Sequence, residues 1–307
     1  MAGQVFFDHD GGVDDFVALL LLLSYDADVL GISVTPADTY LEAALPATRK
    51  ILGLAGRPGV PAAAGTLEGL NPFPHPFRID SLKVDAMPVL NRDPEPPGPP
   101  GDEPGQQLLA RTILEADGPV TLVMTGPLTN LAWALDHHPG VEAHIDELVL
   151  MGGALDVPGN VRQEGHDGSA EWNIFWDPAA ARRVWDSDLA ITIFSLDATD
   201  QVPVTPELRR SLAGQSDHVL SEAAGCFWAL TAGSDYYCWD TLTVSYLARP
   251  DLCTFREVRC EVVTEGPSQG RTIPSADGRS VRAADLVDTQ GFYEHVLATL
   301  RRGGSGG

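Results

Sequence analysis

The chain has 307 residues, of which 44% are hydrophobic, so it is long enough to bury a large core as one α/β domain. Its 43 acidic residues outnumber its 20 basic residues and give a formal net charge of -23, which argues against nucleic acid or an anionic membrane surface as a partner. The longest apolar run, Phe16 to Leu23, is too short to span a membrane, and the N-terminus carries no basic region or cleavage site, so we expect a cytoplasmic protein.

The first predicted unit is a strand over Gln4–Phe7 followed by a buried helix over Val13–Leu23. Four acids lie between the strand and the first helical turn, namely Asp8, Asp10, Asp14 and Asp15. Charges of one sign at this spacing repel one another, and partial burial favours their protonation unless a cation binds among them. Because all the ligands would be oxygen atoms, the cluster predicts a hard cation, calcium or magnesium.

Other interpretations of this acidic cluster are possible. An EF-hand loop counted from Asp8 is excluded, since its sixth and twelfth positions are Val13 and Leu19 instead of glycine and glutamate. The acids could instead be an N-cap and first-turn charges on a solvated helix. They could also belong to an aspartyl-phosphate enzyme, although that chemistry needs a cationic phosphate clamp and the only lysines, Lys50 and Lys83, do not follow predicted strands.

The chain then alternates strands and helices as far as residue 64 and enters a long irregular stretch. The predicted elements are a strand over Val29–Thr35, a helix over Leu41–Ala55 that Gly56 ends, and a short strand over Pro61–Ala63. Residues 65–105 contain many prolines and glycines and read as an excursion over the surface. Such a segment is either a lid or a connector, and the two interpretations stay open.

Regular structure is predicted again in the middle of the chain. The elements are a helix over Gln106–Ala116, a strand over Val120–Met124, a helix from Pro127 to His137, a strand over Glu147–Met151, a loop to Glu171, a helix starting at Asp177, and a strand over Leu189–Phe194. Pro127 suits a first helical position, and Asp177 followed by Pro178 suits an N-cap and a first helical residue.

The last third adds helices and a small group of antiparallel strands. Helices are predicted over residues 206–213, 217–231, 241–247 and 291–302, and strands over residues 257–264, 271–274 and 278–282. The four cysteines lie here without a C-x-x-C pair, which indicates free thiols and no zinc site. We expect one domain over residues 1–302 and a Gly/Ser tail over 303–307.

The alternation of strands and helices predicts an α/β fold with a mostly parallel open sheet flanked by helices and a small antiparallel addition near the C-terminus. In such a sheet the loops after the strands meet along the carboxyl edge, where ligands bind. The loops that follow predicted strands are residues 8–15, 36–38, 125–130, 151–154 and 195–197. We therefore expect these segments to converge on one acidic pocket.

These motifs together resemble the nucleoside hydrolases, ribohydrolases that cut the N-glycosidic bond of nucleosides, over almost the whole chain. The resemblance rests on Asp-x-Asp-x-x-x-Asp-Asp at 8–15, Thr-Gly-Pro-Leu-Thr-Asn at 125–130, Met-Gly-Gly-Ala at 151–154, Gly-Asn at 159–160, Ala-Glu-Trp-Asn at 170–173, Asp-Pro at 177–178 and Trp-Asp at 239–240. Residues 8–11, 71–74, 105–109 and 236–240 look most similar to the purine-preferring branch, which favours inosine, adenosine and guanosine.

The resemblance implies a calcium ion and a general base in the acidic cluster. The implied ligands are the carboxylates of Asp10, Asp15 and Asp240 and the backbone carbonyl of Thr125. Asp10 would also take a proton from the calcium-bound water that attacks the anomeric carbon, while Asp8 would support the cluster from behind. The transition state resembles an oxocarbenium ion, so an anionic pocket suits the developing positive charge.

The resemblance also implies how the nucleoside is held. Residues matching contacts to the ribose hydroxyls are Asp14, Asn160, Glu171 and Asn173, and Trp172 is placed with the substrate-binding residues. Trp239 would stack on the base and make it easier to protonate, at a position where other branches often have a histidine. A core aromatic at a helix start is the alternative for Trp239. Asp38 matches an acid near the base edge.

Two departures from the purine-preferring pattern weaken parts of this assignment. Phe77 stands where that branch has a second stacking tryptophan, so Trp228 or Tyr236 could assist instead, and Gly12 stands where asparagine is expected. The sequence therefore predicts a calcium-dependent purine nucleosidase that releases free base and ribose, with a homodimer implied by the resemblance. The alternatives are a pyrimidine or modified-nucleoside hydrolase on the same fold, and a non-catalytic, metal-dependent nucleoside or sugar binding protein.

Overall fold

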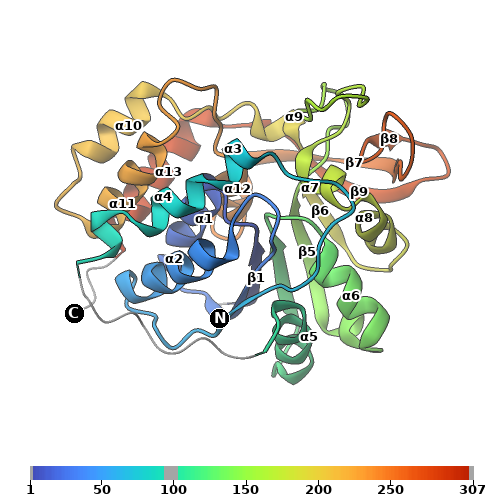
Figure 1. Cartoon of the computed structure of the whole chain (residues 1–307), viewed down its shortest axis with the longest axis horizontal. Helices are drawn as coiled ribbons and strands as arrows, with labels where there is room; N and C mark the ends of the chain where they lie inside the picture. The colour runs from blue at the N-terminus through green and yellow to red at the C-terminus, as the bar shows by residue number, and fades with distance from the viewer. Residues whose placement is uncertain (1–2, 93–102, 304–307) are drawn as a thin grey trace.

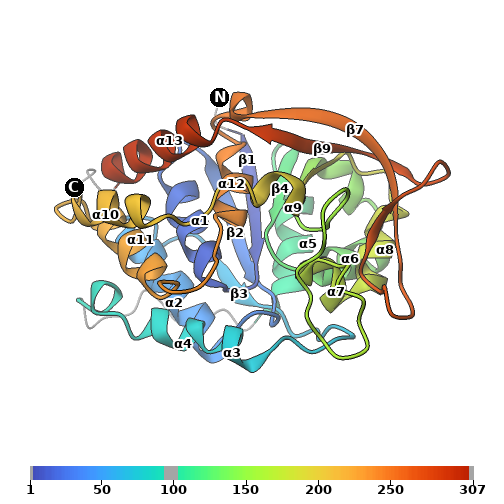
Figure 2. The same ribbon diagram turned by 90° about the horizontal axis from the view of Figure 1, so that it is seen from above.

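The computed structural model describes residues 3–92 and 103–303. These residues form one α/β domain around a nine-stranded sheet of order β3-β2-β1-β4-β5-β6-β9-β7-β8, with helices on both faces (Figures 1 and 2). In the part of the chain that the structure describes, no helix is long and apolar enough to cross a membrane. The predicted fold class is confirmed.

The sheet is parallel from β3 to β9 and antiparallel at its end. Its strands are β1 (Gln4–His9), β2 (Asp28–Val34), β3 (Ala62–Ala64), β4 (Val120–Met124), β5 (Ile145–Met151), β6 (Ile191–Phe194), β7 (Cys253–Val262), β8 (Thr272–Pro274) and β9 (Arg279–Val287). Strand β1 lies between β2 and β4, so the acidic loop that follows it opens at the middle of the carboxyl edge.

Helices cover the two faces of the sheet (Figure 2). The helices are α1 (Val13–Leu23), α2 (Leu41–Leu54), α3 (His75–Arg78), α4 (Asp80–Asp85), α5 (Gly105–Glu115), α6 (Thr129–His137), α7 (Trp172–Trp176), α8 (Pro178–Trp185), α9 (Leu196–Thr199), α10 (Pro206–Ala213), α11 (Val219–Ala229), α12 (Trp239–Ser245) and α13 (Thr289–Arg302). Single 3₁₀ turns occupy Pro88–Leu90, Val141–His144 and Pro250–Leu252.

Helix α1 is the centre of one of the two large hydrophobic cores. All eleven of its residues are buried, as expected for a helix that is apolar on every side. Its core also contains Phe7 of β1, whereas the neighbouring residue Phe6 points to the opposite core under α5, α6 and α8. This alternation follows from the period of two along a strand. The packing fixes α1, and with it the two acids in its first turn.

Several predicted boundaries in the middle of the chain are wrong. Helix α6 begins at Thr129 and not at Pro127, because Leu128 has a non-helical backbone and forms the N-cap. The predicted loop up to Glu171 is followed directly by the short helix α7, which the sequence reading missed, before Asp177 caps α8 as predicted. Helix α12 begins at Trp239, two residues before the predicted Thr241, so Trp239 and Asp240 lie in its first turn.

Two other regions differ from the prediction. Residues 65–92 are not irregular throughout, since they contain α3, α4 and a 3₁₀ turn, and the proline-rich part of this stretch at 93–102 lies outside the described residues. Strands β7 and β9 are longer than predicted. Strand β9 pairs with β6 in parallel, which makes the antiparallel addition a continuation of the central sheet. The four cysteines carry free thiols, and Cys238 and Cys260 are buried.

Shortening Leu20 at the centre of α1 tests the role of this helix as the core of the fold. Leu20 is fully buried, so Leu20→Ala should lower the free energy of unfolding by about 2–5 kcal/mol through lost burial and the cavity it leaves. Denaturant unfolding measures the change. Leu286→Ala is the matched control, because Leu286 is 64% exposed, and it should change the free energy by less than about 0.5 kcal/mol. Equal effects of the two variants would contradict this assignment.

Candidate active site

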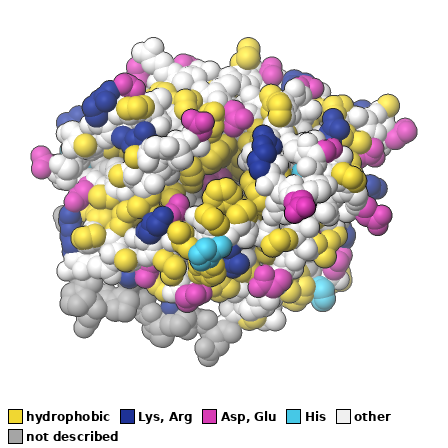
Figure 3. Space-filling view, turned by 45° about the horizontal axis from the view of Figure 1, so that its top comes forward, with side chains coloured by type: hydrophobic (Ala, Val, Ile, Leu, Met, Phe, Trp, Pro, Cys, Tyr) yellow, Lys and Arg dark blue, Asp and Glu magenta, His cyan; other side chains and the backbone are white. Residues whose placement is uncertain are grey.

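A cavity of about 550 Å³ opens at the carboxyl edge of the sheet. Figure 3 shows hydrophobic side chains gathered around a hollow in the middle of the face seen from that side. The carboxylates in its lining are Asp10, Asp15, Asp38, Asp80, Glu171, Asp200, Asp235 and Asp240, and the aromatic rings are Phe73, Phe77, Trp172, Tyr236, Tyr237 and Trp239. The predicted acidic pocket therefore forms, and it has an aromatic wall.

Asp8 lies behind the cavity and is fully buried. Its carboxylate accepts hydrogen bonds from the Ser33 hydroxyl, from Thr35 Oγ1 at 3.0 Å and from Asn130 Nδ2 at 2.8 Å. Burial raises the pKa of Asp8 to about 7, against the lowering effect of these three donors. The predicted supporting position of Asp8 agrees with this geometry, and the strand ends of β1 and β2 and the start of α6 are joined through its carboxylate.

Asp10 and Asp15 form the acidic floor of the cavity. Their carboxyl groups share a hydrogen bond that raises the pKa of Asp10 and lowers that of Asp15. Asp15 also accepts from the Gly12 amide at 2.8 Å and from Thr125 Oγ1 at 2.5 Å. Burial is the largest cause of the raised pKa of Asp10, followed by the charges of Asp15 and Asp38, and burial raises the pKa of Asp15 to about 6.

Two glycines allow the backbone to close around this floor. Gly11 has φ +78°, a left-handed conformation that favours glycine. A Cβ at Gly126 would lie 2.9 Å from the Cβ of Asp10, so the loop after β4 could not approach Asp10 with a larger residue there. The glycine in the Thr-Gly-Pro sequence thus brings Thr125 beside Asp10 and Asp15.

Asp38 lies beside the floor, in the loop after β2. Its backbone amide donates to Asp10 Oδ2 at 3.3 Å, and its own Oδ1 is buried with no hydrogen-bond partner among the described residues. Burial is the main cause of its raised pKa, followed by the charge of Asp15. A Cβ at Gly12 would lie 3.0 Å from Asp38 Oδ2, so the absent side chain at Gly12 leaves the space that the Asp38 carboxylate fills.

Asp240 reaches the cavity from the first turn of α12, and Asp14 holds that turn in place. Asp14 Oδ2 accepts from the backbone amides of Asp240 at 2.7 Å and of Thr241 at 3.0 Å. Asp14 Oδ1 accepts from Thr241 Oγ1 at 2.8 Å and from Trp228 Nε1 at 3.1 Å. Burial raises the pKa of Asp14 to about 7, and burial followed by the charges of Asp15 and Asp14 raises that of Asp240.

The structure does not place Asp14 and Trp228 on the cavity surface. Asp14 is absent from the lining, and its four protein donors explain why it binds the start of α12. The suggestion that Trp228 could stack on a base is wrong, because this ring is fully buried and its indole donates to Asp14. Tyr236 does line the cavity, and its hydroxyl accepts from the Asp14 amide at 3.3 Å.

The predicted ribose residues Asn160, Glu171 and Asn173 meet on one wall. Glu171 caps α7, accepting from the amides of Asn173 and Ile174, and burial raises its pKa to about 7. Asn160 Oδ1 accepts from the Trp172 amide at 3.1 Å, which leaves its amide nitrogen to face a ligand. Asn173 Nδ2 donates to the carbonyl of Thr125 at 2.9 Å, so that carbonyl keeps one lone pair for another partner.

Aromatic rings close the cavity on two sides. Trp239 lies 4.6 Å from Tyr236 between ring centroids, and its indole nitrogen donates to Asp200 Oδ1 at 3.2 Å. Phe73, Phe77 and Trp172 form a second cluster, with Phe73 and Trp172 4.7 Å apart and Phe77 47% exposed. Trp239 is therefore not only a core aromatic at a helix start, because one part of it packs inside and another part faces the cavity.

The carboxylate oxygen atoms in the cavity are the ligands that the predicted cation would need. Among the described residues, no three His, Cys, Asp or Glu side chains stand in the geometry of a formed metal site. The donors nevertheless suit a hard cation, because Asp10, Asp15 and Asp240 present only oxygen atoms to one cavity. The charge of Asp15 raises the pKa of Asp10, and the charges of Asp15 and Asp10 raise that of Asp240. A divalent cation would compensate these charges.

Sequence reasoning missed the residues that hold the acids in place. Ser33 on β2 and Thr35 directly after it bind Asp8, and Trp228 and Thr241 bind Asp14. Among these partners, only Asn130 belonged to a recognised motif, since it ends the Thr-Gly-Pro-Leu-Thr-Asn sequence. Ser33 and Thr35 are two residues apart at the end of an otherwise apolar segment, and these two polar side chains could have indicated a polar partner on β1.

Known proteins resemble this chain over nearly its whole length. The sequence model described as "Inosine-uridine preferring nucleoside hydrolase" matches residues 5–294. The chain is 30% identical to the pyrimidine-specific ribonucleoside hydrolase RihA of Shewanella woodyi, with 98% of each chain covered. It is 39% identical to the inosine-uridine preferring nucleoside hydrolase of Bacillus anthracis, whose crystal structure superposes with a TM-score of 0.94 over 97% of this chain and 99% of that one.

A further similar structure is that of an enzyme with a different base preference. The purine-preferring ribonucleoside hydrolase from Gardnerella vaginalis is 25% identical and superposes with a TM-score of 0.81 over 97% of this chain and 98% of that one. The similar proteins thus carry names for pyrimidine, mixed and purine preference.

The raised pKa values predict how the stability of the cation-free protein depends on pH. Asp8, Asp14 and Glu171 titrate at about 7 in the folded chain, against ordinary values of 3.8 and 4.5. The folded chain therefore keeps protons that the unfolded chain has released, and this stabilisation is full below the ordinary values and is lost as pH rises through the folded values. In chelator, Tm should fall as pH rises from about 5 to about 8.

Calcium provides the control in the same thermal unfolding series. Cation binding requires deprotonated carboxylates, so added calcium should raise Tm most at the highest pH and flatten the dependence. A Tm that does not change with pH in chelator, or that does not respond to calcium at any pH, would contradict the assignment of the acidic floor.

Proposed function

Because the chain belongs to the inosine-uridine preferring nucleoside hydrolase family and is a hydrolase that acts on ribonucleosides, we propose that it prefers purine ribonucleosides and releases free base and ribose with calcium as its cation. The proposal rests on the aromatic wall of the cavity that faces the carboxylates. Trp239 and Tyr236 form that wall, and no histidine lines the cavity among the described residues.

The aromatic wall favours a purine substrate because of the way in which the base leaves the sugar. When the N-glycosidic bond breaks, the base takes the electron pair and needs a proton or a means of spreading its charge. A purine has a basic imidazole nitrogen, N7, that accepts a proton from solvent, and stacking on an indole assists that protonation. A pyrimidine lacks this nitrogen and depends more on a nearby acid. Trp239, at the start of α12, is placed to supply stacking and not a proton.

A pyrimidine substrate is the second candidate, and a specific observation favours it. The named relative at 30% identity is pyrimidine-specific. In addition, Phe77 gives a smaller stacking surface than a tryptophan would, and its side chain is 47% exposed. The two candidates differ only in the base, and both use the same acidic floor.

Asp10 is the residue that we propose as the general base. Burial and the charges of Asp15 and Asp38 raise its pKa, so its carboxylate takes a proton more readily than an ordinary aspartate does. It accepts the proton of the attacking water as the oxygen of that water bonds to the anomeric carbon and the bond to the base nitrogen breaks. Bound calcium would orient the water and the ribose hydroxyls at Asp10, Asp15, Asp240 and the Thr125 carbonyl.

The remaining polar residues hold the sugar and stabilise its charge. Asn160, Glu171 and Asn173 lie on one wall and would bind the ribose hydroxyls, which fixes the anomeric carbon over Asp10. Positive charge develops on the sugar ring as the bond breaks. Carboxylates that line a partly dry cavity stabilise this charge more than water would, so the acidic lining lowers the barrier.

A substrate panel tests the proposal directly. Inosine, adenosine, guanosine, uridine and cytidine are each assayed for free base, with a nucleoside monophosphate as a further substrate, in calcium and in chelator. We expect turnover of the purine nucleosides at least about tenfold above uridine in kcat/KM, which corresponds to roughly 1.4 kcal/mol in the transition state, and loss of activity in chelator. Uridine turnover above inosine would establish the pyrimidine candidate, and full activity in chelator would refute the calcium assignment.

The variant Trp239→Leu separates the role of the ring from that of the fold. Loss of the stacking contact should reduce kcat on inosine by about tenfold, as expected for an aromatic contact of roughly 0.5–1.5 kcal/mol, with a smaller effect on uridine. Trp133→Leu on α6 is the matched control, because Trp133 stacks on His137 away from the cavity. Equal losses on inosine and uridine would show that Trp239 does not select the base.

Asp10→Ala tests the general base. The variant should fold and keep some ribose affinity through Asn160 and Asn173, while kcat falls by about 10²–10⁴-fold or more, because it loses both a proton acceptor and an oxygen ligand. Steady-state kinetics and ribose titration measure the two effects. Asp186→Ala is the control, because it removes an exposed carboxylate that pairs with Arg182 and does not line the cavity. An Asp10→Ala variant that stays active would show that another group is the base.

A further inference from the structure

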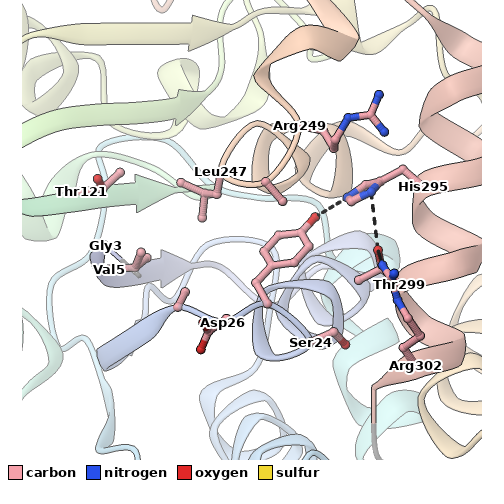
Figure 4. A pocket seen from close by; sticks show the side chains of 13 residues that line it. Gly3, Val5, Ser24, Asp26, Thr121, Leu247, Arg249, His295, Thr299 and Arg302 are labelled. Atoms are coloured by element: carbon pink, nitrogen blue, oxygen red, sulfur yellow. Dashed lines mark hydrogen bonds between the residues drawn. The ribbon is translucent and has the colours of Figure 1, made fainter. Parts of the chain in front are cut away.

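A cavity of about 650 Å³ at the amino edge of the sheet contains polar groups that bind one another (Figure 4). The Tyr25 hydroxyl, for example, lies 2.8 Å from His295 Nε2. At the carboxyl edge, by contrast, one such pair includes a ring that faces the active site. The carboxylate of Asp200 accepts the indole hydrogen of Trp239, and both residues line the acidic cavity.

The backbone brings Asp200 to this ring from another part of the sheet. Asp200 is the C-cap residue of α9, the short helix that follows β6. The chain beyond it runs antiparallel to the segment that leads into α12, and the amide of Cys238 donates to the Val202 carbonyl at 2.9 Å. Because Trp239 directly follows Cys238, this pairing places the Asp200 carboxylate beside the indole.

Aromatic and apolar contacts hold the Trp239 ring, and one hydrogen bond selects its orientation. The ring of Tyr236 meets it edge-on with the centroids 4.6 Å apart, and that of Tyr237 lies at 5.5 Å. Part of the indole packs on the small apolar cluster that contains Leu196. The indole nitrogen is the only polar atom of the ring and can only donate. Its bond to Asp200 Oδ1, at 3.2 Å, therefore favours the observed orientation over the flipped one.

A carboxylate on the indole hydrogen also changes the charge distribution of the ring. A hydrogen bond to an ionised acceptor draws the proton away from the nitrogen, so the electron density on the face of the ring rises. That density attracts a cation stacked on the face, and indole attracts cations more strongly than the other aromatic side chains. Partial burial raises the pKa of Asp200, and the bond from Trp239 opposes this shift because it stabilises the carboxylate.

We propose that Asp200 acts through Trp239 as a positioning residue for a protonated base, a role that rests on the proposed stacking of the base on this ring. A purine that takes a proton from solvent on N7 is positively charged. The charge is neutralised when the bond between N9 and the anomeric carbon breaks and its electron pair stays on N9. The electron-rich indole stabilises the charged form. A leaving group that departs without a proton never carries this charge and gains nothing from Asp200.

Two leaving groups separate this role from a general effect of charge. Inosine needs a proton on its base, whereas 4-nitrophenyl β-D-ribofuranoside releases nitrophenolate without one, and both develop positive charge on the sugar. Asp200→Asn keeps an oxygen acceptor for the indole but removes its charge. It should lower kcat on inosine by about fivefold with KM unchanged, because the lost interaction belongs to the transition state. The loss on the nitrophenyl riboside should stay below about twofold. Equal losses on the two substrates would overturn the proposal.

A double variant shows whether Asp200 acts through the ring. The phenyl ring in a Trp239→Phe background has no N–H group, so adding Asp200→Asn there should cause no further loss on inosine. The same loss in both backgrounds would show that Asp200 contacts the substrate itself, which contradicts the proposal. Glu207→Gln on α10 is the matched control, because it also removes one carboxylate charge and the Glu207 side chain is 72% exposed and outside the cavity lining.

NMR spectra of the full chain test the hydrogen bond independently of catalysis. Trp239→Phe assigns the indole N–H signal among the six tryptophans. This signal should shift upfield in Asp200→Asn, shift further in Asp200→Ala, and stay in place in Glu207→Gln. An unchanged signal in Asp200→Ala would overturn the proposal.

The base preference of the unmodified chain is judged separately from these results. Preference for uridine, together with the expected signal shift and a loss on inosine that depends on Trp239, would refute the purine preference alone. Preference for inosine, together with independent effects of Asp200→Asn and Trp239→Phe, would refute the role of Asp200 alone.

Discussion

The buried carboxylates at the carboxyl edge are the constraint on which the rest of this structure depends. Asp8, Asp10, Asp14 and Asp15 lie within eight residues, and each is at most 4% exposed. A charged carboxylate at such depth is unstable unless hydrogen bonds, protons or a cation compensate it. The fold provides a different compensation for each acid. Protein donors surround Asp8 and Asp14, whereas Asp10 and Asp15 hydrogen-bond to each other and face the cavity. The acids without enough protein donors are therefore the ones that a cation would stabilise.

The acid that ties the site together is Asp14, although it does not face the cavity. Through the backbone amides of Asp240 and Thr241 it fixes the first turn of α12, and through Trp228 it connects that turn with α11. Asp240 and Trp239 belong to that turn, so one carboxylate positions both an acid and an aromatic ring of the cavity. Loss of the Asp14 carboxylate would therefore displace two functions at once. Contacts with the ribose hydroxyls, which the family resemblance implies for Asp14, would compete with these four donors.

Much of the fold and of the site could be predicted from the sequence wherever residues close together in the chain determine the structure. The alternation of apolar segments gives the parallel sheet, and the apolar run after Asp15 gives the buried helix α1. The aspartate and proline at 177–178 give the start of α8. The features that the sequence did not reveal depend on contacts between residues far apart in the chain. Glu171 caps α7 in a segment without helical periodicity, and the bond from Trp228 to Asp14 joins residues 214 positions apart. The start of α6 was also wrong, because Pro127 lies in the turn that lets Gly126 approach Asp10.

The charge at the carboxyl edge of the sheet has a consequence for substrate choice. The cavity at the carboxyl edge is lined by eight carboxylates and one arginine, Arg162, in the described part of the chain. A phosphate on the substrate would meet this field at short range in a partly dry cavity, where charge repulsion is stronger than in bulk water. An uncharged nucleoside meets no such barrier, and its ring gains stabilisation as positive charge develops. On the proposed mechanism, the carboxylates that would favour the transition state would also repel a nucleotide, so catalysis and the choice of nucleosides over nucleotides would have one electrostatic origin.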